Sequence, residues 1–231
     1  MAAYLWLFWQ YLKGRGWPQS TSQARRESLR AAPLSPKTWR RALLAGGAAT
    51  VSLRALHDMC RRLSTRPEAD LISPDKLNVY PPWTVLCLLL VMAAVAGIIE
   101  EAAFRGYMQA PLEQKYGWRP AIATVAAVFA LAHFPFGAPD TIPWLVFLPA
   151  YLGAAVAFGA LASFTGSIVP GIVLHTVLDT LGLLQYWLLG IPRSVWEVGA
   201  DKGLWIRLLV ALGAGAVAIP AYRRLSRERA S

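Results

Sequence analysis

The sequence predicts an all-α membrane protein, a polytopic bundle of about six transmembrane helices (five to eight) with its polar residues inside the bundle. Three observations predict this class. Of the 231 residues, 56% are hydrophobic and only 16% are charged. The chain contains 10 tryptophans and has a mean hydropathy of +0.41. Apolar segments of about 20 residues, the length that crosses a bilayer, recur along it and leave no room for a separate soluble domain.

Six segments are predicted to cross the membrane, with short connections between most of them. Their approximate ranges are 40–57, 83–110, 120–136, 143–164, 167–190 and 204–221. The first is short and contains Arg54, so a tilted or half-inserted helix is an alternative there. The polar, proline-containing stretch 58–82 is expected to be a loop. The predicted organisation is therefore a basic, interfacial or cytoplasmic segment (1–39), a membrane domain (40–222, with a motif core at 83–190) and a basic cytoplasmic tail (223–231).

The net charge of +10 arises from basic residues that flank the apolar segments, mainly between Lys13 and Arg41 and between Arg223 and Arg229. This distribution follows the positive-inside rule and favours a lipid bilayer, not nucleic acid, as the partner. It predicts cytoplasmic termini and an external loop around Asp140. The alanine- and arginine-rich composition, with no organellar targeting signal or cleavable signal peptide, indicates the bacterial inner (plasma) membrane. The two cysteines support neither a disulfide framework nor a Cys metal site.

A small set of ionisable residues is predicted at bilayer depth, where such residues are rare and mark function. The set consists of Glu100, Glu101, Arg105, His133, His175 and Asp179, with Arg54 and Arg207 nearer their helix ends. Polar groups in lipid must contact one another or water, so one buried cluster is expected to contain Glu100, His133, His175 and Asp179. Two carboxylates with two imidazoles can activate water, coordinate a metal or relay protons.

Helical spacing constrains how these residues pair. Glu101 and Arg105 are four residues apart and are expected to form an ion pair on one helix face. Glu100 points about 100° away from that face and remains available for another role. The helix is expected to continue towards Pro111, which would put Glu100 near the middle of its span.

Three motifs in order resemble those of the CAAX-protease and bacteriocin-processing (CPBP, or Abi) family, which includes the type II CAAX prenyl endopeptidase. The motifs are E-E-x-x-x-R, F-x-x-x-H and H-x-x-x-N/D, read here as Glu100-Glu101 to Arg105, Phe129 to His133, and His175 to Asp179. The stretch FRGYMQAPLEQKYG also resembles the family, and the resemblance covers roughly residues 83–190. It implies an intramembrane endopeptidase of glutamic type, formerly classed as a metalloprotease, that hydrolyses a peptide bond in a membrane-anchored protein or peptide.

The resemblance also implies roles for these residues. Glu100 would be the base that activates water with help from His133, while His175 and Asp179 would stabilise the oxyanion and Glu101 and Arg105 would support the site. Many members have Asn where this chain has Asp179. An ionised Asp cannot donate a hydrogen bond, so Asp179 must be neutral, or else it orients and charges His175. No cofactor is expected, although this departure leaves zinc, held by Glu100, His133 and His175, as an alternative.

Two other functional classes remain as alternatives. A non-enzymatic membrane immunity or scaffold protein could use the same polar cluster for binding. A proton-coupled transporter is disfavoured because no paired, inverted arrangement of interrupted helices is visible. If the chain is a protease, Glu100→Ala, His133→Ala and His175→Ala are each expected to abolish cleavage, whereas Arg54→Ala is expected to matter far less.

Overall fold

The computed structural model describes residues 2–64, 74–134, 142–190 and 192–229. Within these ranges the chain forms helices and turns and contains no strand, which confirms the predicted all-α class. The elements are α1 (Ala2–Leu12), η1 (Gln19–Thr21), α2 (Ser22–Leu29), α3 (Pro36–Leu63), α4 (Pro74–Leu77), α5 (Pro82–Glu100), the π-helix η2 (Glu101–Met108), α6 (Gln109–Tyr116), α7 (Trp118–Ala132), η3 (Ile142–Phe147), α8 (Leu148–Thr165), α9 (Val169–Leu189), α10 (Val195–Val198) and α11 (Lys202–Arg229).

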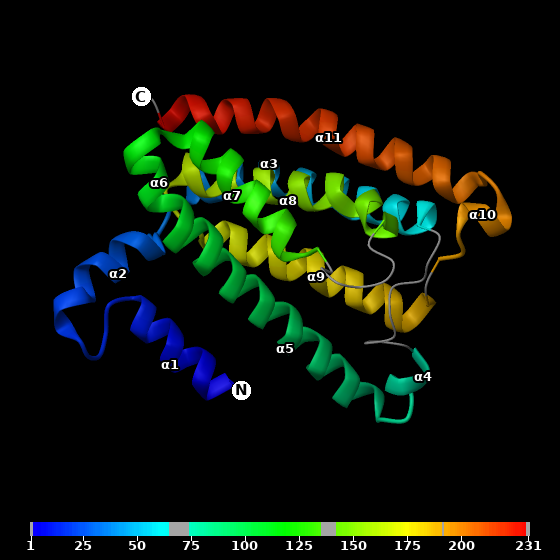
Figure 1. The fold of residues 1–231 in the computed structure, drawn as a ribbon, viewed down its shortest axis with the longest axis horizontal. Coiled ribbons are helices and arrows are strands. Elements are labelled where there is room, and N and C mark those ends of the chain that lie inside the picture. Colours follow the sequence, from blue (N-terminus) through cyan, green and yellow to red (C-terminus); the bar gives the residue numbers. More distant parts are fainter. Residues whose placement is uncertain (1, 65–73, 135–141, 191, 230–231) are drawn as a thin grey trace.

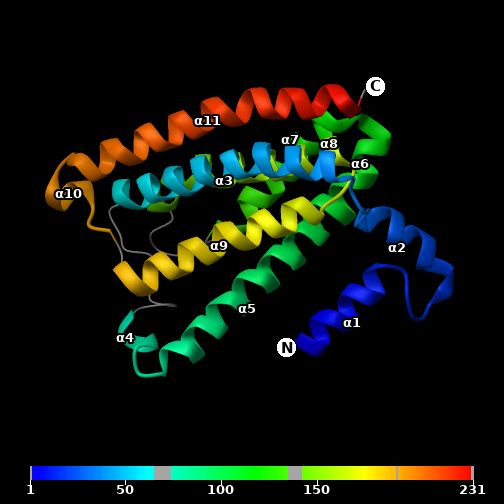
Figure 2. The same ribbon diagram turned by 180° about the vertical axis from the view of Figure 1, so that it is seen from behind.

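The long elements α3, α5, α7, α8, α9 and α11 run in alternating directions along the long axis of the molecule (Figures 1 and 2). In the view of Figure 1, α2, α6 and the carboxyl end of α11 lie at the same end of this bundle. The basic residues of α2 and of the last turns of α11 are therefore on one side, as the positive-inside pattern predicts. Which compartment this side faces stays a prediction, and the loop around Asp140 lies outside the described residues.

Four of the predicted spans are confirmed as helices long and apolar enough to cross a membrane. They are Pro82–Tyr116, Leu145–Thr165, Val169–Leu189 and Lys202–Arg227. The first is a continuous run of 35 residues. At 1.5 Å per residue it is about 50 Å long, which exceeds the bilayer's hydrocarbon core of about 30 Å. These helices make the protein an integral membrane protein.

The other two predicted spans differ from the expectation. The α7 helix has only 15 residues, about 22 Å, and ends just before His133, so it is too short to cross the hydrocarbon core alone. The α3 helix includes residues 58–63, which were expected to be loop, while residues 65–73 lie outside the described part. It is not among the helices apolar enough to span lipid. It packs against α8, α9 and α11, and this protein environment explains its polar residues.

Small and aliphatic side chains hold the bundle together. One buried cluster joins α3, α8, α9 and α11 through Ala42, Phe158, Leu161, Leu174 and Leu225. A second cluster packs Leu12 and Leu29 of the N-terminal helices against Ala102 of the π-helix and against Ala162 and Ile168. Small residues allow helices to approach closely, which is the main source of attraction between helices in lipid. The N-terminal helices are therefore packed onto the part of the chain that carries the motif E-E-x-x-x-R.

An ion pair outside the spans links the end of α3 to the start of α11. Arg62 Nη1 donates a hydrogen bond to Asp201 Oδ1, and Arg62 Nε donates to the carbonyl oxygen of Arg193. The hydrogen bond from Arg62 lowers the pKa of the Asp201 carboxyl to about 2. Asp201 Oδ1 also accepts a hydrogen bond from the backbone N–H of Leu204, so the same carboxylate caps the N-terminus of α11.

Candidate active site

The helix that carries the first motif changes its winding in the middle. Glu100 is the last residue of α5, and the π-helix η2 begins at Glu101 and ends at Met108. π-Helical turns are rare and occur mostly as short insertions, frequently at functional sites. The helix continues through α6 to Tyr116, so Glu100 lies near its middle, as predicted. The π-helical winding itself was not predicted from the sequence.

Three helices bring four of the predicted residues together. Glu100 Oε2 lies 3.8 Å from His133 Nε2 and 3.8 Å from His175 Nε2. On α9, His175 Nε2 lies 3.7 Å from Asp179 Oδ2. All four side chains line one cavity of about 360 Å³. The structure thus assembles the buried cluster that was expected from their depth in the membrane.

The imidazole of His175 is held at both its face and its Nδ1 atom. Nδ1 lies 3.0 Å from Glu101 Oε1, and the ring of Phe158 stacks on the imidazole at a centroid distance of 5.1 Å and an angle of 12°. With Nδ1 bonded to Glu101, Nε2 points to Glu100 and Asp179. Sequence spacing assigned Glu101 to Arg105 alone and missed this contact, because residues 74 positions apart give no local signal.

The ion pair expected between Glu101 and Arg105 is present and fully buried. Arg105 Nη1 lies 3.1 Å from Glu101 Oε1, and both side chains are 0% exposed. The guanidinium is surrounded by the rings of Phe104, Phe129 and Phe158, at 6.0, 4.6 and 5.7 Å from their centroids. Aromatic faces attract a desolvated cation. Arg105 is thus a buried counter-ion within an aromatic cage, away from the cavity lining.

Two glycines allow α9 to approach the long helix at the site. A Cβ at Gly171 would lie 2.6 Å from Glu101 Oε2, and a Cβ at Gly97 would lie 2.5 Å from the hydroxyl of Thr176. Real Cβ atoms essentially never make contacts this short. Gly171 therefore lets the buried carboxylate contact α9, and no motif in the sequence identified this requirement.

His133 lies at the carboxyl end of α7, where the helix leaves carbonyl groups unpaired. Its Nδ1 lies 2.8 Å from the carbonyl oxygen of Phe129, and its ring stacks on Tyr151 at 4.8 Å and 26°. A neutral imidazole that donates from Nδ1 presents an acceptor at Nε2, and this atom faces Glu100. Because Phe129 lies four residues before His133, its backbone carbonyl oxygen is in position to hold the His133 ring. Tyr151 was not predicted as part of the site.

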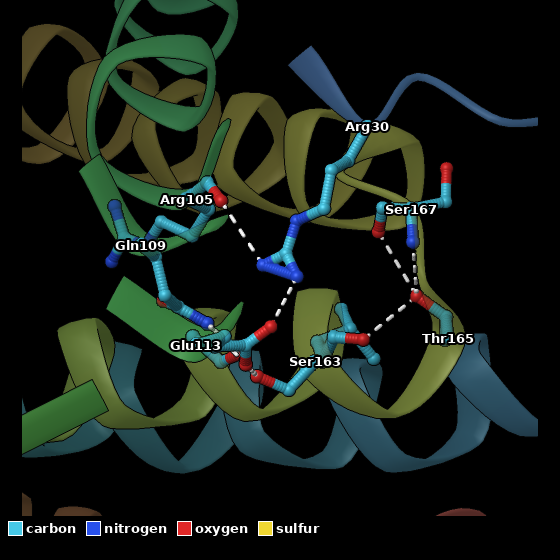
Figure 3. A network of polar contacts seen from close by, with 9 residues as sticks. Arg30, Arg105, Gln109, Glu113, Ser163, Thr165 and Ser167 are labelled. Carbon is cyan, nitrogen blue, oxygen red and sulfur yellow. Dashed lines mark hydrogen bonds and ion pairs between the residues drawn. The ribbon is translucent and has the colours of Figure 1, made fainter. Parts of the chain in front are cut away.

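A polar network supports the far end of the π-helix (Figure 3). Arg30, at the end of α2, donates to the carbonyl oxygen of Arg105 at 3.3 Å and forms an ion pair with Glu113. Glu113 also accepts from the hydroxyl of Ser163 on α8. Gln109, fully buried, donates to Ser163 Oγ at 2.9 Å. The N-terminal segment and α8 therefore hold the helix that carries Glu101 and Arg105.

The α3 helix contributes a second polar region to the same cavity. Arg54, His57 and Arg61 line it together with Tyr186 of α9. Arg61 Nε donates to His57 Nδ1 at 3.1 Å, and its guanidinium lies over the ring of Tyr186 at 3.4 Å from the centroid. Arg54 was expected nearer a helix end. The sequence did not predict that His57, Arg61 and Tyr186 lie at the site. His57 and Arg61 are on α3, whose sequence contains none of the three motifs.

Zinc held by Glu100, His133 and His175 was the alternative to a metal-free site. Within the described ranges, no three His, Cys, Asp or Glu side chains are grouped so that they could hold a metal ion. Nδ1 of His175 is bonded to Glu101 and Nδ1 of His133 to a backbone carbonyl, which leaves both Nε2 atoms directed at the same carboxylate oxygen, 3.8 Å from each. Whether the site uses zinc therefore stays a prediction, and no step of the reaction is derived through a metal.

Comparison with known families gives one match. Residues 82–181 match the model of the Rce1-like family, described as type II CAAX prenyl endopeptidase Rce1-like. The matched region is less than half of the chain and contains all seven residues of the three motifs. No match was found among curated proteins or among solved structures. Residues 82–181 are thus similar to the Rce1-like family of type II CAAX prenyl endopeptidases, and this match supports the resemblance to the CAAX-protease and bacteriocin-processing family.

Proposed function

We propose that this protein is a glutamate-dependent intramembrane endopeptidase that uses no metal ion and hydrolyses a peptide bond in a membrane-anchored protein or peptide. The observation that carries the proposal is the position of Glu100 Oε2, 3.8 Å from the Nε2 atoms of both His133 and His175 in one cavity. The family match over residues 82–181 supports the protease class.

Glu100 and His133 are suited to activating water. Glu100 Oε2 is buried and bonds to no described side chain, and His133 Nε2 faces it as an acceptor. A water molecule that lies beside these two atoms can donate one hydrogen to each at normal hydrogen-bond distances. As the water oxygen attacks the scissile carbonyl carbon, its proton passes to Glu100. General base catalysis of this kind contributes about 10²–10⁴-fold to the rate.

His175 is suited to stabilising the oxyanion. When protonated, it donates from Nδ1 to Glu101 and from Nε2 into the cavity, where charge develops on the carbonyl oxygen. Asp179, 3.7 Å from that Nε2 atom, adds a donor if its carboxyl is neutral. The proton held by Glu100 then passes to the leaving nitrogen as the carbon–nitrogen bond breaks.

Asp179→Asn tests the role of the residue that departs from the family pattern. We expect this variant to keep activity within about tenfold of wild type, since an amide N–H donates where a neutral carboxyl would. We also expect activity to persist at higher pH than in wild type, because the amide does not ionise. The measurement is kcat/KM against pH for wild type, Asp179→Asn and Asp179→Ala. If Asn is as inactive as Ala, Asp179 instead acts by charging His175.

The proposed function is tested by mapping protein termini in membranes of cells that carry either wild type or Glu100→Ala. We expect a defined set of membrane-anchored proteins to lose a terminus in Glu100→Ala, and the same set to be affected in His133→Ala and His175→Ala. Arg207→Ala, outside the cavity lining, is the control and should leave the termini unchanged. Identical termini in all strains, together with a mutant phenotype, would favour a binding or scaffold protein.

Metal dependence is tested on purified active protein. We expect cleavage to continue in the presence of a strong chelator at far less than one zinc per chain. Stoichiometric zinc combined with loss of cleavage on chelation would replace the glutamate-dependent mechanism by a zinc-dependent one.

A further inference from the structure

A groove of about 580 Å³ runs between α3, α8 and α11, and its lining is mostly apolar. Small residues of all three helices leave room for it, among them Ala49, Gly153 and Gly215. Val156 and Ile219, which also line it, are exposed, so the groove opens to the surroundings of the bundle. Because α8 and α11 are membrane-spanning helices, these surroundings are lipid. The groove is separate from the cavity of the polar cluster and shares only Leu53 with it among the described residues.

One end of the groove carries a cation. Arg223 is the one charged residue among those that line it in the described structure, and its side chain is exposed. The preceding residue, Tyr222, donates a hydrogen bond from its hydroxyl to the carbonyl oxygen of Ala157 at 3.0 Å. This bond joins α11 to α8 at the same level and fixes the part of α11 that carries the guanidinium.

The surroundings of Arg223 are strongly basic. The start of α3 and the carboxyl end of α11 lie at the same end of the bundle (Figures 1 and 2). No Asp or Glu occurs at residues 36–57 of α3 or 202–227 of α11. The basic residues in the first two turns of α3 and the last two turns of α11 are Lys37, Arg40, Arg41, Arg223, Arg224 and Arg227. This end is the one that the positive-inside pattern assigns to the cytoplasm, where the leaflet is rich in anionic lipids.

Arg223 lies at the depth of the lipid headgroups. It follows Lys202, the first residue of α11, by 21 positions, which is about 31 Å along a helix. The hydrocarbon core is about 30 Å thick, so the two residues lie near opposite surfaces of the membrane. From Arg223 the groove extends along α11 to Gly215, eight residues or about 12 Å towards the bilayer centre. One leaflet contributes about 15 Å of hydrocarbon, so the groove spans most of a leaflet.

We infer that this groove is a binding site for one anionic phospholipid of the leaflet at the basic end. An acyl chain lies in the apolar groove between α3, α8 and α11, and Arg223 binds the phosphate. The guanidinium suits this task because it stays charged and its fork of donors matches phosphate oxygens. Basic sites between membrane helices on the cytoplasmic side are typical positions for anionic headgroups. The inference does not depend on the proposed protease function, because neither the groove nor Arg223 belongs to the polar cluster.

The test measures lipid binding by native mass spectrometry of the full chain, purified in detergent and stripped of lipid. The probes are phosphatidylglycerol and phosphatidylcholine with identical palmitoyl and oleoyl chains, so that only the headgroup differs. Arg223→Gln and Arg223→Lys change the headgroup contact. Arg224→Gln is the matched control, because it removes the same charge from the next residue, which does not line the groove.

A second pair of variants tests whether the acyl chain occupies the groove. Val156→Trp places a large side chain in the groove from a position that is 47% exposed, so the change is expected to be tolerated. Val217→Trp makes the same change at a position of α11 that is 51% exposed and does not line the groove. Circular dichroism during heating checks that all variants fold as wild type does.

We expect wild type to bind phosphatidylglycerol about tenfold more tightly than phosphatidylcholine, because the phosphate of the zwitterionic lipid is neutralised within its own headgroup. Arg223→Gln should abolish this preference, Arg223→Lys should keep part of it and Arg224→Gln nearly all of it. Val156→Trp should weaken the binding of both lipids, whereas Val217→Trp should leave it unchanged.

Three results would overturn the inference. Equal binding of the two lipids would show that no anionic headgroup is recognised. Equal losses in Arg223→Gln and Arg224→Gln would assign the preference to the general charge of this end and not to a site. Lipid binding that Val156→Trp does not weaken would place the acyl chain elsewhere, and a dimer that Val156→Trp dissociates would show that a second copy of the chain occupies the groove.

Discussion

Glu100→Gln is expected to lower kcat by about 10²–10⁴-fold with little change in the binding of substrate, because an amide of the same size cannot accept the proton of the attacking water. Glu100 Oε2 is the one carboxylate oxygen at 3.8 Å from both His133 and His175 Nε2 among the described residues. The measurement is single-turnover cleavage of a substrate identified by terminus mapping, which separates chemistry from product release.

The control for this substitution is Glu197→Gln, the same chemical change at an exposed position of α10. It should leave kcat unchanged. Both variants should have the thermal stability of wild type in detergent, so that a loss of activity in Glu100→Gln cannot be attributed to unfolding. Full activity of Glu100→Gln on a verified substrate would rule out Glu100 as the base.

Arg105→Ala is expected to lower the free energy of unfolding by about 3–5 kcal/mol, since removing one partner leaves the other as an uncompensated buried charge. Glu101 and Arg105 are both fully buried. Among the described residues, the other ionisable side chain that contacts Glu101 Oε1 is His175, through its Nδ1 atom. The variant also empties the space between three phenylalanine rings. The measurement is denaturant-induced unfolding in detergent, followed by tryptophan fluorescence.

Two further variants show whether this effect belongs to the buried pair. The double variant Glu101→Gln with Arg105→Met should recover part of the lost stability, because neither charge is then left unpaired. Arg207→Ala removes a partly exposed ion pair with Asp58 and should cost about 1 kcal/mol or less. If Arg105→Ala were as stable as wild type, the Glu101–Arg105 pair would have no structural role.

Much of the fold was predictable because hydrophobicity and helical spacing are local properties. Four of the six predicted spans are apolar helices of sufficient length, and the pair Glu101–Arg105 follows from four-residue spacing on one helix. The cluster of Glu100, His133, His175 and Asp179 was predictable because polar groups in lipid gather together. The spans that differed, α3 and α7, are those whose surroundings are protein or whose end forms part of the site.

The all-α membrane class, the resemblance to the protease family and the residues of the polar cluster were all predictable from the sequence, because apolar length, motif order and helical spacing are properties of neighbouring residues. Three features became known from the folded structure: Glu101 bonds His175, a π-helix carries Arg105, and Arg54 of α3 lies against Gly182 of α9. These features depend on contacts between helices far apart in the chain. Their geometry arises from packing, and one sequence contains no local signal for it.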